Sequence, residues 1–492
     1  MSTEIKFIDT TIRDGMASLW AQSMNTGTML GVLPDLDRAG FESMEFLSPG
    51  TRTKKMAQDL GEDMLQWLKR GAALASKTEL RLHGGLQSGH SLVPFSVRRL
   101  VAEMAVSQGI TIDRSSNSWN DFEEHKINIQ EMRSLGLRPV VNVIYAISPK
   151  HTIDYYRERI RQAAALKPYR LCFKDVGGLL TPETTRELTR IFMESANGIE
   201  VEFHAHSTNG LAPINVLEAV KGGIRHIHTA IPPLANGTSQ PSILNVASNL
   251  RALGFDPVVD EAPLQPAMEK LAFVAHHEHF PIGAPRLFDQ ALYNHQVPGG
   301  MMSNLVHQLK LVGMEDKFQQ TLDEIVQVRA DFGYPIMVTP LAQFVGSQAA
   351  INVIAGERYK QVSDEVIQYA LGLWGREAVT AMDQEVRAKI LDRKRARELT
   401  MSEPPDPSLK ELRAQYGENT TDEELILRFY GGEKALAVMG KSSNPEDVFS
   451  ARQPIVALLE RFAKQRRFRH VAVQKGDTSM TLRSAPEIAS QV

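Results

Sequence analysis

Two histidines separated by one residue, His204 and His206, are the clearest candidates for chemistry in this 492-residue sequence. On an extended strand, residues i and i+2 point to the same side, so both imidazoles would face one point. Asp14 and Lys174 follow two other short apolar runs. Imidazole nitrogens combined with oxygen ligands suit Zn, Mn or Co. The four residues are therefore candidate ligands of a divalent metal, although a His-x-His pair also occurs as a hydrogen-bonded core pair.

Lys174 and Asp14 each allow a second interpretation. Burying an ammonium at the end of an apolar strand is costly, so Lys174 would need either a salt bridge to Asp175 or loss of its charge. An uncharged amine can add CO2, and the resulting carbamate is an anionic oxygen ligand. Asp14 could equally cap a helix or pair with Arg13. The order of all four candidates along one chain favours the metal site.

The elements that must position these residues alternate between strands and helices. Helical patterns cover residues 25–39, 94–108 and 182–195, among others. The pattern predicts a parallel (β/α)8 TIM barrel, because an open doubly wound sheet would carry a glycine-rich phosphate turn after its first strand. In such a barrel the chemistry lies at the C-terminal ends of the strands. The eight expected strands are 6–9, 43–46, 80–83, 110–113, 140–144, 171–174, 201–204 and 226–229.

After about residue 300, short strand-like apolar runs no longer alternate with helical patterns. Residues 315–332 and 363–372 have helical patterns, 400–407 is a polar, proline-containing linker, and 471–473 is strand-like. We therefore predict a metal-binding TIM-barrel domain, a mostly helical domain and a polar tail. Their expected bounds are 1–300, 301–470 and 471–492.

Composition excludes several classes of protein. Hydrophobic content of 42% and charged content of 23% are those of a globular chain. The net charge is −3, and the basic run 393–397 is best interpreted as a solvated helix face, so nucleic acid is not expected as a partner. The single cysteine, Cys172, allows no internal disulfide and fits a reducing compartment. We expect no signal peptide, no membrane span and a cytoplasmic enzyme.

Four motifs resemble the carboxyltransferase family of biotin-dependent enzymes, which includes the carboxyltransferase domain of pyruvate carboxylase, the oxaloacetate decarboxylase alpha chain and the transcarboxylase metal-binding subunit. Further matches occur at 298–305, 333–340 and 356–360, and resemble the family's helical second domain. The resemblance covers about residues 5–470. The four motifs are Asp9-Thr10-Thr11-Ile12-Arg13-Asp14, the stretch 172–182 from Cys172-Phe173-Lys174-Asp175, His204-Ala205-His206-Ser207-Thr208-Asn209-Gly210, and Asn236-Gly237-Thr238-Ser239-Gln240-Pro241.

The resemblance implies roles for several residues. Asp14, carbamylated Lys174, His204 and His206 would hold the metal. Arg13 would lie beside the carboxylate or enolate oxygen of a small keto or carboxylic acid, and Thr238 would shuttle a proton between enolate and biotin. Relatives tend to pair, so a homodimer is expected.

The chain departs from the family where substrate and biotin bind. The family's keto-acid glutamine aligns with Ala17, and its third-strand arginine aligns with His83. A family tyrosine aligns near His90, and the family's Gly-Gly-Ala-Thr-Phe-Asp segment is replaced by residues 47–52. Because a guanidinium fork is lost at His83, this histidine is a candidate general acid or base, or alternatively a packed polar residue.

Three functions follow from these observations. No Met-Lys pair is present, so the chain lacks the usual biotin attachment motif. The first function is a metal-dependent carboxyltransferase or decarboxylase that works through an enolate, with biotin on a separate carrier protein. The second is a biotin-independent lyase or decarboxylase of the same superfamily, which the changes at Ala17, His83 and His90 favour. The third is a catalytically silent scaffold subunit.

Overall fold

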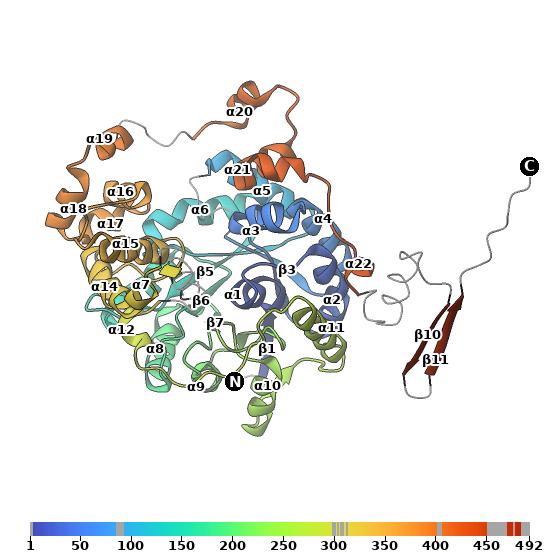
Figure 1. Cartoon of the computed structure of the whole chain (residues 1–492). Coiled ribbons are helices and arrows are strands. Elements are labelled where there is room, and N and C mark those ends of the chain that lie inside the picture. The colour runs from blue at the N-terminus through green and yellow to red at the C-terminus, as the bar shows by residue number, and fades with distance from the viewer. Residues whose placement is uncertain are drawn as a thin grey trace, which may run out of the picture.

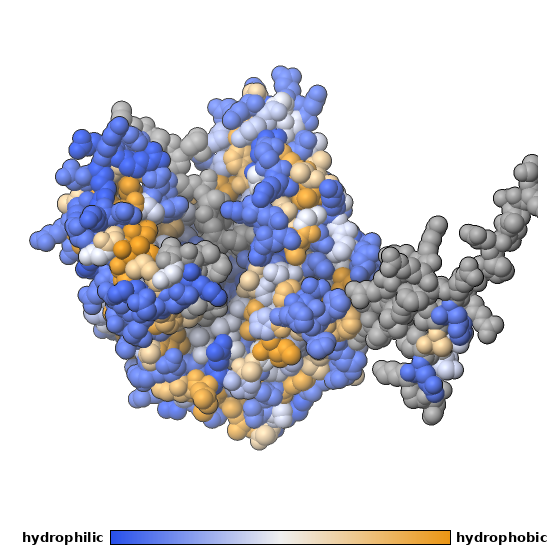
Figure 2. All heavy atoms as spheres, viewed as in Figure 1, coloured by the Kyte–Doolittle hydropathy of each residue, from blue (hydrophilic) through white to orange (hydrophobic). Residues whose placement is uncertain are grey.

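The structure, a computed structural model, describes residues 3–84, 93–297, 302, 305, 309–310, 313–400, 406–449, 470–475 and 478–483. Figure 1 shows a barrel with a helical region beside it and a C-terminal hairpin that projects away from both. The space-filling view shows a face that is mostly hydrophilic, with smaller apolar areas over both the barrel and the helical region (Figure 2).

Eight parallel strands close into a barrel. Strand β1 pairs with both β8 and β2, so the sheet has no free edge there, and an open doubly wound sheet is ruled out. A short ninth strand, β9 (Asp256–Val258), adds to the other end of β1. The barrel strands are β1 (Glu4–Asp9), β2 (Ser43–Leu47), β3 (Glu79–His83), β4 (Ile112–Ser115), β5 (Arg138–Ile144), β6 (Arg170–Asp175), β7 (Val201–Ala205) and β8 (His226–Thr229).

The expected strands are present, and one is displaced. The fourth was predicted at 110–113, whereas β4 begins two residues later. Gly109 adopts a positive φ of 88°, and the Ile110 N–H donates to the Ala105 carbonyl at 3.1 Å. Ile110 therefore closes the preceding helix instead of opening the strand. This displacement matters because it places Arg114 inside β4.

Helices surround the barrel and begin at residues suited to capping. Thr181 accepts a hydrogen bond from the Thr184 N–H at the start of α8, and Pro182 occupies its first position. The helices predicted at 25–39, 94–108 and 182–195 correspond to α2, α5 and α8. The barrel helices are α1 (Met16–Leu19), α2 (Thr26–Arg38), α3 (Pro49–Lys55), α4 (Met64–Leu74), α5 (Phe95–Ser107), α6 (Phe122–Ser134), α7 (Ile153–Ala165), α8 (Pro182–Ser195), α9 (Ala212–Lys221), α10 (Ile243–Ala252) and α11 (Leu264–His277), with π-helical turns η1 (Thr11–Gly15) and η2 (Met56–Leu60).

A second hydrophobic core lies in the helical region. Ile325 and Val328 of α14 pack with Val345 and Ala349 of α15. Trp119, which follows β4, belongs to this core instead of the barrel core. The helices here are α12 (Leu292–His295), the 3-10 turn η3 (Glu315–Lys317), α14 (Phe318–Asp331), α15 (Leu341–Ala355), α16 (Asp364–Leu371), α17 (Arg376–Ala381), α18 (Gln384–Leu391) and α19 (Lys394–Thr400).

The chain then returns to the barrel. The last helices are α20 (Leu409–Tyr416), α21 (Asp422–Ala437) and α22 (Pro445–Phe449). Leu425, Ile426 and Tyr430 of α21 join the barrel core, and Figure 1 shows α21 above α3 and α5. The division at residues 300 and 470 stays a prediction, but two cores and this return are features of the fold.

The C-terminal part ends in an antiparallel hairpin, β10 (His470–Lys475) and β11 (Thr478–Arg483), whose first strand includes the strand-like residues 471–473. Of the expected linker 400–407, residues 401–405 lie outside the described ranges. Among the described helices, none is both long and apolar enough to cross a membrane.

Candidate metal centre and the polar interior of the barrel

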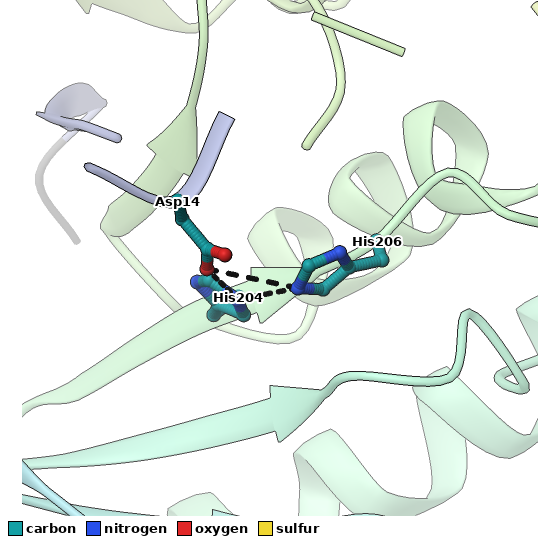
Figure 3. A group of neighbouring side chains, drawn as sticks. All are labelled: Asp14, His204 and His206. Carbon is teal, nitrogen blue, oxygen red and sulfur yellow. Dashed lines mark hydrogen bonds and ion pairs between the residues drawn. The ribbon is translucent and has the colours of Figure 1, made fainter. Parts of the chain in front are cut away.

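One carboxylate and two imidazoles converge at the C-terminal end of β7. His204 lies on β7, His206 follows its last residue, and Asp14 comes from the π-helical turn after β1. Asp14 Oδ2 lies 3.2 Å from His204 Nε2 and 3.7 Å from His206 Nε2, and the two Nε2 atoms are 3.2 Å apart. Figure 3 shows the three groups turned toward one another. The i, i+2 spacing therefore brings both imidazoles to one point, as expected.

His206 presents a free lone pair to this point. Its Nδ1 lies 2.7 Å from the carbonyl oxygen of Thr238. Because a carbonyl only accepts, Nδ1 carries the proton and Nε2 is bare. A bare imidazole nitrogen beside a carboxylate oxygen is a donor set that fits a divalent cation.

Asp14 is ionised. Burial alone would raise the pKa of this carboxyl, but the Arg13 guanidinium beside it holds the pKa well below its usual range. Arg13 Nη2 lies 2.9 Å from Asp14 Oδ2, so Asp14 does pair with Arg13, as one interpretation expected. The same arginine also donates through Nε to Glu45 Oε2 at 2.7 Å.

Lys174 lies beside this group without an ion-pair partner among the described residues. It is 8% exposed and stands opposite His204 in the β6–β7 register. Burial lowers its pKa to about 7, with further lowering by Arg114 and Arg13, while Asp14 opposes the shift. A large fraction of Lys174 is therefore an uncharged amine at neutral pH.

The alternative partner of Lys174, Asp175, is engaged elsewhere. Its carboxylate accepts the backbone N–H groups of Leu179 at 3.0 Å and Leu180 at 2.8 Å. Alternation along β6 points the two side chains to opposite faces of the strand. A salt bridge between them is absent from the described part of the chain.

His83 lies at the end of β3 and is half-buried. Its Nδ1 donates to the carbonyl oxygen of Arg114 at 2.9 Å. Burial lowers the pKa of His83 well below its usual value, and the positive charges of Arg13 and Arg114 add to this effect. The imidazole is therefore neutral, and its Nε2 is a hydrogen-bond acceptor.

Thr238 lies close to the group through its backbone. Its carbonyl oxygen accepts a hydrogen bond from His206 Nδ1, and its hydroxyl donates to the Ser18 carbonyl at 2.8 Å. Ala17 is half-buried on α1, one residue before Ser18. His90 lies outside the described residues, so its expected place at the site stays a prediction.

Gln240 is a site residue that the sequence did not single out. Its side chain is fully buried, and its amide nitrogen lies 3.1 Å from His206 Nε2 and 3.3 Å from both His204 Nε2 and Asp14 Oδ2. Thr10 donates to its oxygen at 2.8 Å. The signal was available, because Gln240 belongs to the motif that contains Thr238.

A buried layer of charge lies next to the candidate ligands, and it was also missed. Arg81 and Glu202 form a fully buried ion pair, and Arg114 and Glu45 form another. The available signal was a charged residue inside each of four short strands that are otherwise rich in apolar residues: Glu45 in β2, Arg81 in β3, Arg114 in β4 and Glu202 in β7.

Two family models match this chain. One, described as HMGL-like, matches residues 4–269, and one described as a conserved carboxylase domain matches residues 292–478. The first therefore spans the barrel strands, and the second spans the helical region and most of the return to the barrel.

Curated proteins are similar over most of the chain. A pyruvate carboxylase subunit of Methanocaldococcus jannaschii is 34% identical over 392 residues, which cover 79% of this chain and 68% of that protein. The 2-oxoglutarate carboxylase large subunit of Hydrogenobacter thermophilus is 30% identical, with 86% and 66% covered. The methylmalonyl-CoA carboxyltransferase 5S subunit of Propionibacterium freudenreichii is 26% identical, with 86% and 85% covered.

Solved structures share the fold. The carboxyl transferase domain from Rhizobium etli pyruvate carboxylase superposes with a TM-score of 0.77 at 22% identity, covering 89% of this chain and 78% of that one. The complete Rhizobium etli enzyme gives a TM-score of 0.80 at 22% identity. The arrangement of a barrel and an adjoining helical region is therefore shared with these proteins.

Proposed function

Because the chain belongs to the carboxyltransferase family of biotin-dependent enzymes, we propose that it moves a carboxyl group between biotin, carried on a separate protein, and a small keto acid. In the proposed site, Asp14, His204, His206 and carbamylated Lys174 hold a divalent cation. The observation that carries the proposal is the convergence of Asp14, His204 and His206 beside a buried lysine whose pKa is lowered to about 7.

The proposed ligands differ in what they need before they bind. Asp14 is already ionised, and His206 already presents a bare nitrogen. Lys174 must first add CO2: its lone pair forms an N–C bond, and a proton leaves the nitrogen, which gives a carbamate. A buried amine with a pKa of about 7 supports this step, because only the uncharged form is nucleophilic. A divalent cation held there would supply Lewis acidity.

Three other residues would act on the acid. Arg13, fixed between Glu45 and Asp14, adds positive charge beside the oxygen that becomes negative in an enolate. Thr238 would carry the proton between enolate and biotin. In the structure, its hydroxyl donates a hydrogen bond to the backbone carbonyl of Ser18. His83 would turn its bare Nε2 toward the acid, where it can accept a proton but cannot donate to the acid's oxygens.

His83 also defines the second candidate function. A neutral imidazole cannot replace the carboxylate-gripping fork of an arginine, but it can remove a proton. With Ala17 in place of a glutamine, these features favour a biotin-independent metal-dependent lyase or decarboxylase. Keto acids other than pyruvate belong in any test, since 2-oxoglutarate is named for one relative.

The test separates the two functions. Purified chain loaded with Zn²⁺, Mn²⁺ or Co²⁺ is mixed with a biotin carrier protein and oxaloacetate or another carboxylated keto acid, and carboxyl loss is measured with and without avidin. Turnover that requires the carrier and stops with avidin supports the carboxyltransferase. Avidin-resistant turnover without the carrier supports the lyase, and absence of both contradicts the proposed activity. Light scattering tests the proposed homodimer.

A further inference from the structure

A line of buried polar side chains runs from the metal centre into the barrel. His204 Nδ1 lies 3.2 Å from His228 Nδ1, and His228 Nε2 lies 3.0 Å from Glu202 Oε2. Arg81 donates to both oxygens of Glu202, at 2.7 and 2.8 Å. All four side chains are fully buried, so water does not compete for these contacts.

The protons in this line can be placed from its far end. Glu202 is held as a carboxylate because both of its oxygens accept from the Arg81 guanidinium. A carboxylate only accepts hydrogen bonds, so the 3.0 Å contact requires a proton on His228 Nε2. Arg81 at 2.7 Å and Arg170 at 3.4 Å already give Glu202 two cationic partners, so a further cation there would be an uncompensated buried charge. His228 is therefore neutral, and its Nδ1 is bare.

The position of the proton on His204 follows. His228 Nδ1 can only accept, so the 3.2 Å contact is a hydrogen bond when His204 donates through Nδ1, and this is the tautomer that a cation bound at Nε2 would require. Its Nε2 then carries no proton. That atom lies 3.2 Å from Asp14 Oδ2 and 3.2 Å from the bare Nε2 of His206. The amide nitrogen of Gln240, 3.1 to 3.3 Å from all three acceptor atoms, supplies the N–H groups that they share.

We infer that Arg81, Glu202 and His228 are positioning residues that fix His204 in the tautomer whose Nε2 can bind a cation. The inference rests on the proposed metal function of His204. His206 reaches the same state by a shorter route, through the Thr238 carbonyl. The same groups are less suited to a second cation site, since Arg81 and Arg114 already pair with the nearby carboxylates of Glu202 and Glu45.

Two substitutions at one position test the line. His228→Leu removes the acceptor for His204. His228→Gln can keep both hydrogen bonds, because its amide oxygen can accept from His204 and its amide nitrogen can donate to Glu202. The dissociation constant of Zn²⁺ is measured by chelator competition. Mutating the hydrogen-bond partner of a metal-bound histidine typically weakens metal affinity about 10–100-fold. We therefore expect a weakening of this order in His228→Leu and recovery of most of the Zn²⁺ affinity in His228→Gln.

His226 supplies the matched control. It lies two residues earlier on β8 and bonds Glu42 at the opposite end of the barrel, so His226→Gln should bind Zn²⁺ like the native chain. Thermal unfolding is recorded in chelator and in Zn²⁺. If His228 has a purely structural role, His228→Leu lowers the unfolding midpoint equally in chelator and in Zn²⁺. If it positions His204, the increase in midpoint that Zn²⁺ produces is smaller in the variant than in the native chain. If His228→Leu does not fold, His228→Phe, which keeps a ring, takes its place.

The outcomes distinguish the inference from the function on which it rests. Native affinity in His228→Leu, together with lost affinity in His204→Ala, overturns the positioning role and leaves the metal site in place. Native affinity in both variants overturns the metal site itself. Weak binding in Leu, recovery in Gln and native binding in His226→Gln support the inference.

Discussion

At the scale of single residues, the site depends on charges that have been taken out of water. Asp14 keeps its negative charge because Arg13 lies beside it, while burial and the nearby positive charge of Arg114 lower the pKa of Lys174 to about 7. The opposite outcomes follow from local partners, since both side chains are buried. Such pairs of perturbed groups are typical of functional sites.

The first prediction concerns Lys174. Lys174→Ala removes the amine that would become a carbamate, so we expect Zn²⁺ affinity and turnover to fall together, and added acetate or propionate to restore part of both. Metal content by atomic absorption and titration by chelator competition measure the effect. Unchanged occupancy in this variant would show that position 174 is not a ligand.

A second prediction concerns pH. Glu42 bonds Arg170 at 2.8 and 2.9 Å and His226 at 3.0 Å. Despite burial, these partners hold the pKa of Glu42 below its ordinary value of 4.5. A lowered folded-state pKa stabilises the protein above the unfolded pKa, and the contribution is lost as pH falls. Denaturant unfolding should therefore show Glu42→Gln less stable than the native chain at pH 7, with the difference narrowing below pH 4.5. A constant difference across pH would contradict this.

At the scale of elements, loops fix the candidate ligands as much as strands do. Gly178, in the loop after β6, has a φ of 67°, and a Cβ there would lie 2.9 Å from the His206 carbonyl oxygen and 3.0 Å from the Thr208 nitrogen. The backbone that carries His206 thus packs directly on the backbone that follows Lys174. Only glycine fits both the conformation and this approach.

Gly178→Ala should therefore weaken metal binding as well as stability. The control is Gly136→Ala, where φ is 82° but a Cβ would meet nothing within 4 Å. Both variants carry the cost of a left-handed alanine, about 1 kcal/mol, and only Gly178→Ala displaces a ligand backbone. Zn²⁺ titration of the two variants separates these effects, and equal affinities would refute the role given to this loop.

How much the sequence revealed can be judged from particular elements. The strands were visible because short apolar runs stand between helical patterns, and β4 was misplaced because the helix end at Gly109 and Ile110 looks like apolar strand. His204 and His206 were found because their spacing is local. His228 and Glu202 were missed because their meeting depends on the register between β7 and β8, which one sequence does not state.

At the scale of the whole molecule, Trp119 connects the barrel to the helical region. It follows β4, yet its ring lies in the helical core beside Tyr369, with Nε1 donating to the Trp374 carbonyl at 3.3 Å. Nearby, Arg376 pairs with Asp121, which caps α6. The two cores are therefore joined by both an apolar insertion and an ion pair.

Trp119→Ala should uncouple the two cores. Replacing a buried tryptophan by alanine costs about 3–5 kcal/mol, and here the lost contacts bridge two cores. We expect calorimetry to show two separated transitions where the native chain shows one, with the barrel transition less affected. Ile325→Ala, at a fully buried position of α14 in the helical core, serves as the comparison. A single transition in Trp119→Ala would mean that other contacts couple the cores.

The return of the chain to the barrel also bears on biosynthesis. Leu425, Ile426 and Tyr430 cover apolar groups of the first hundred residues, and Phe449 fills the space beside Gly31 on α2. During translation these surfaces emerge hundreds of residues before their covering helices. A nascent or truncated barrel that ends near residue 300 therefore exposes this apolar surface to chaperones and to other chains. The surface stays uncovered until the residues of α21 and α22 have been synthesised.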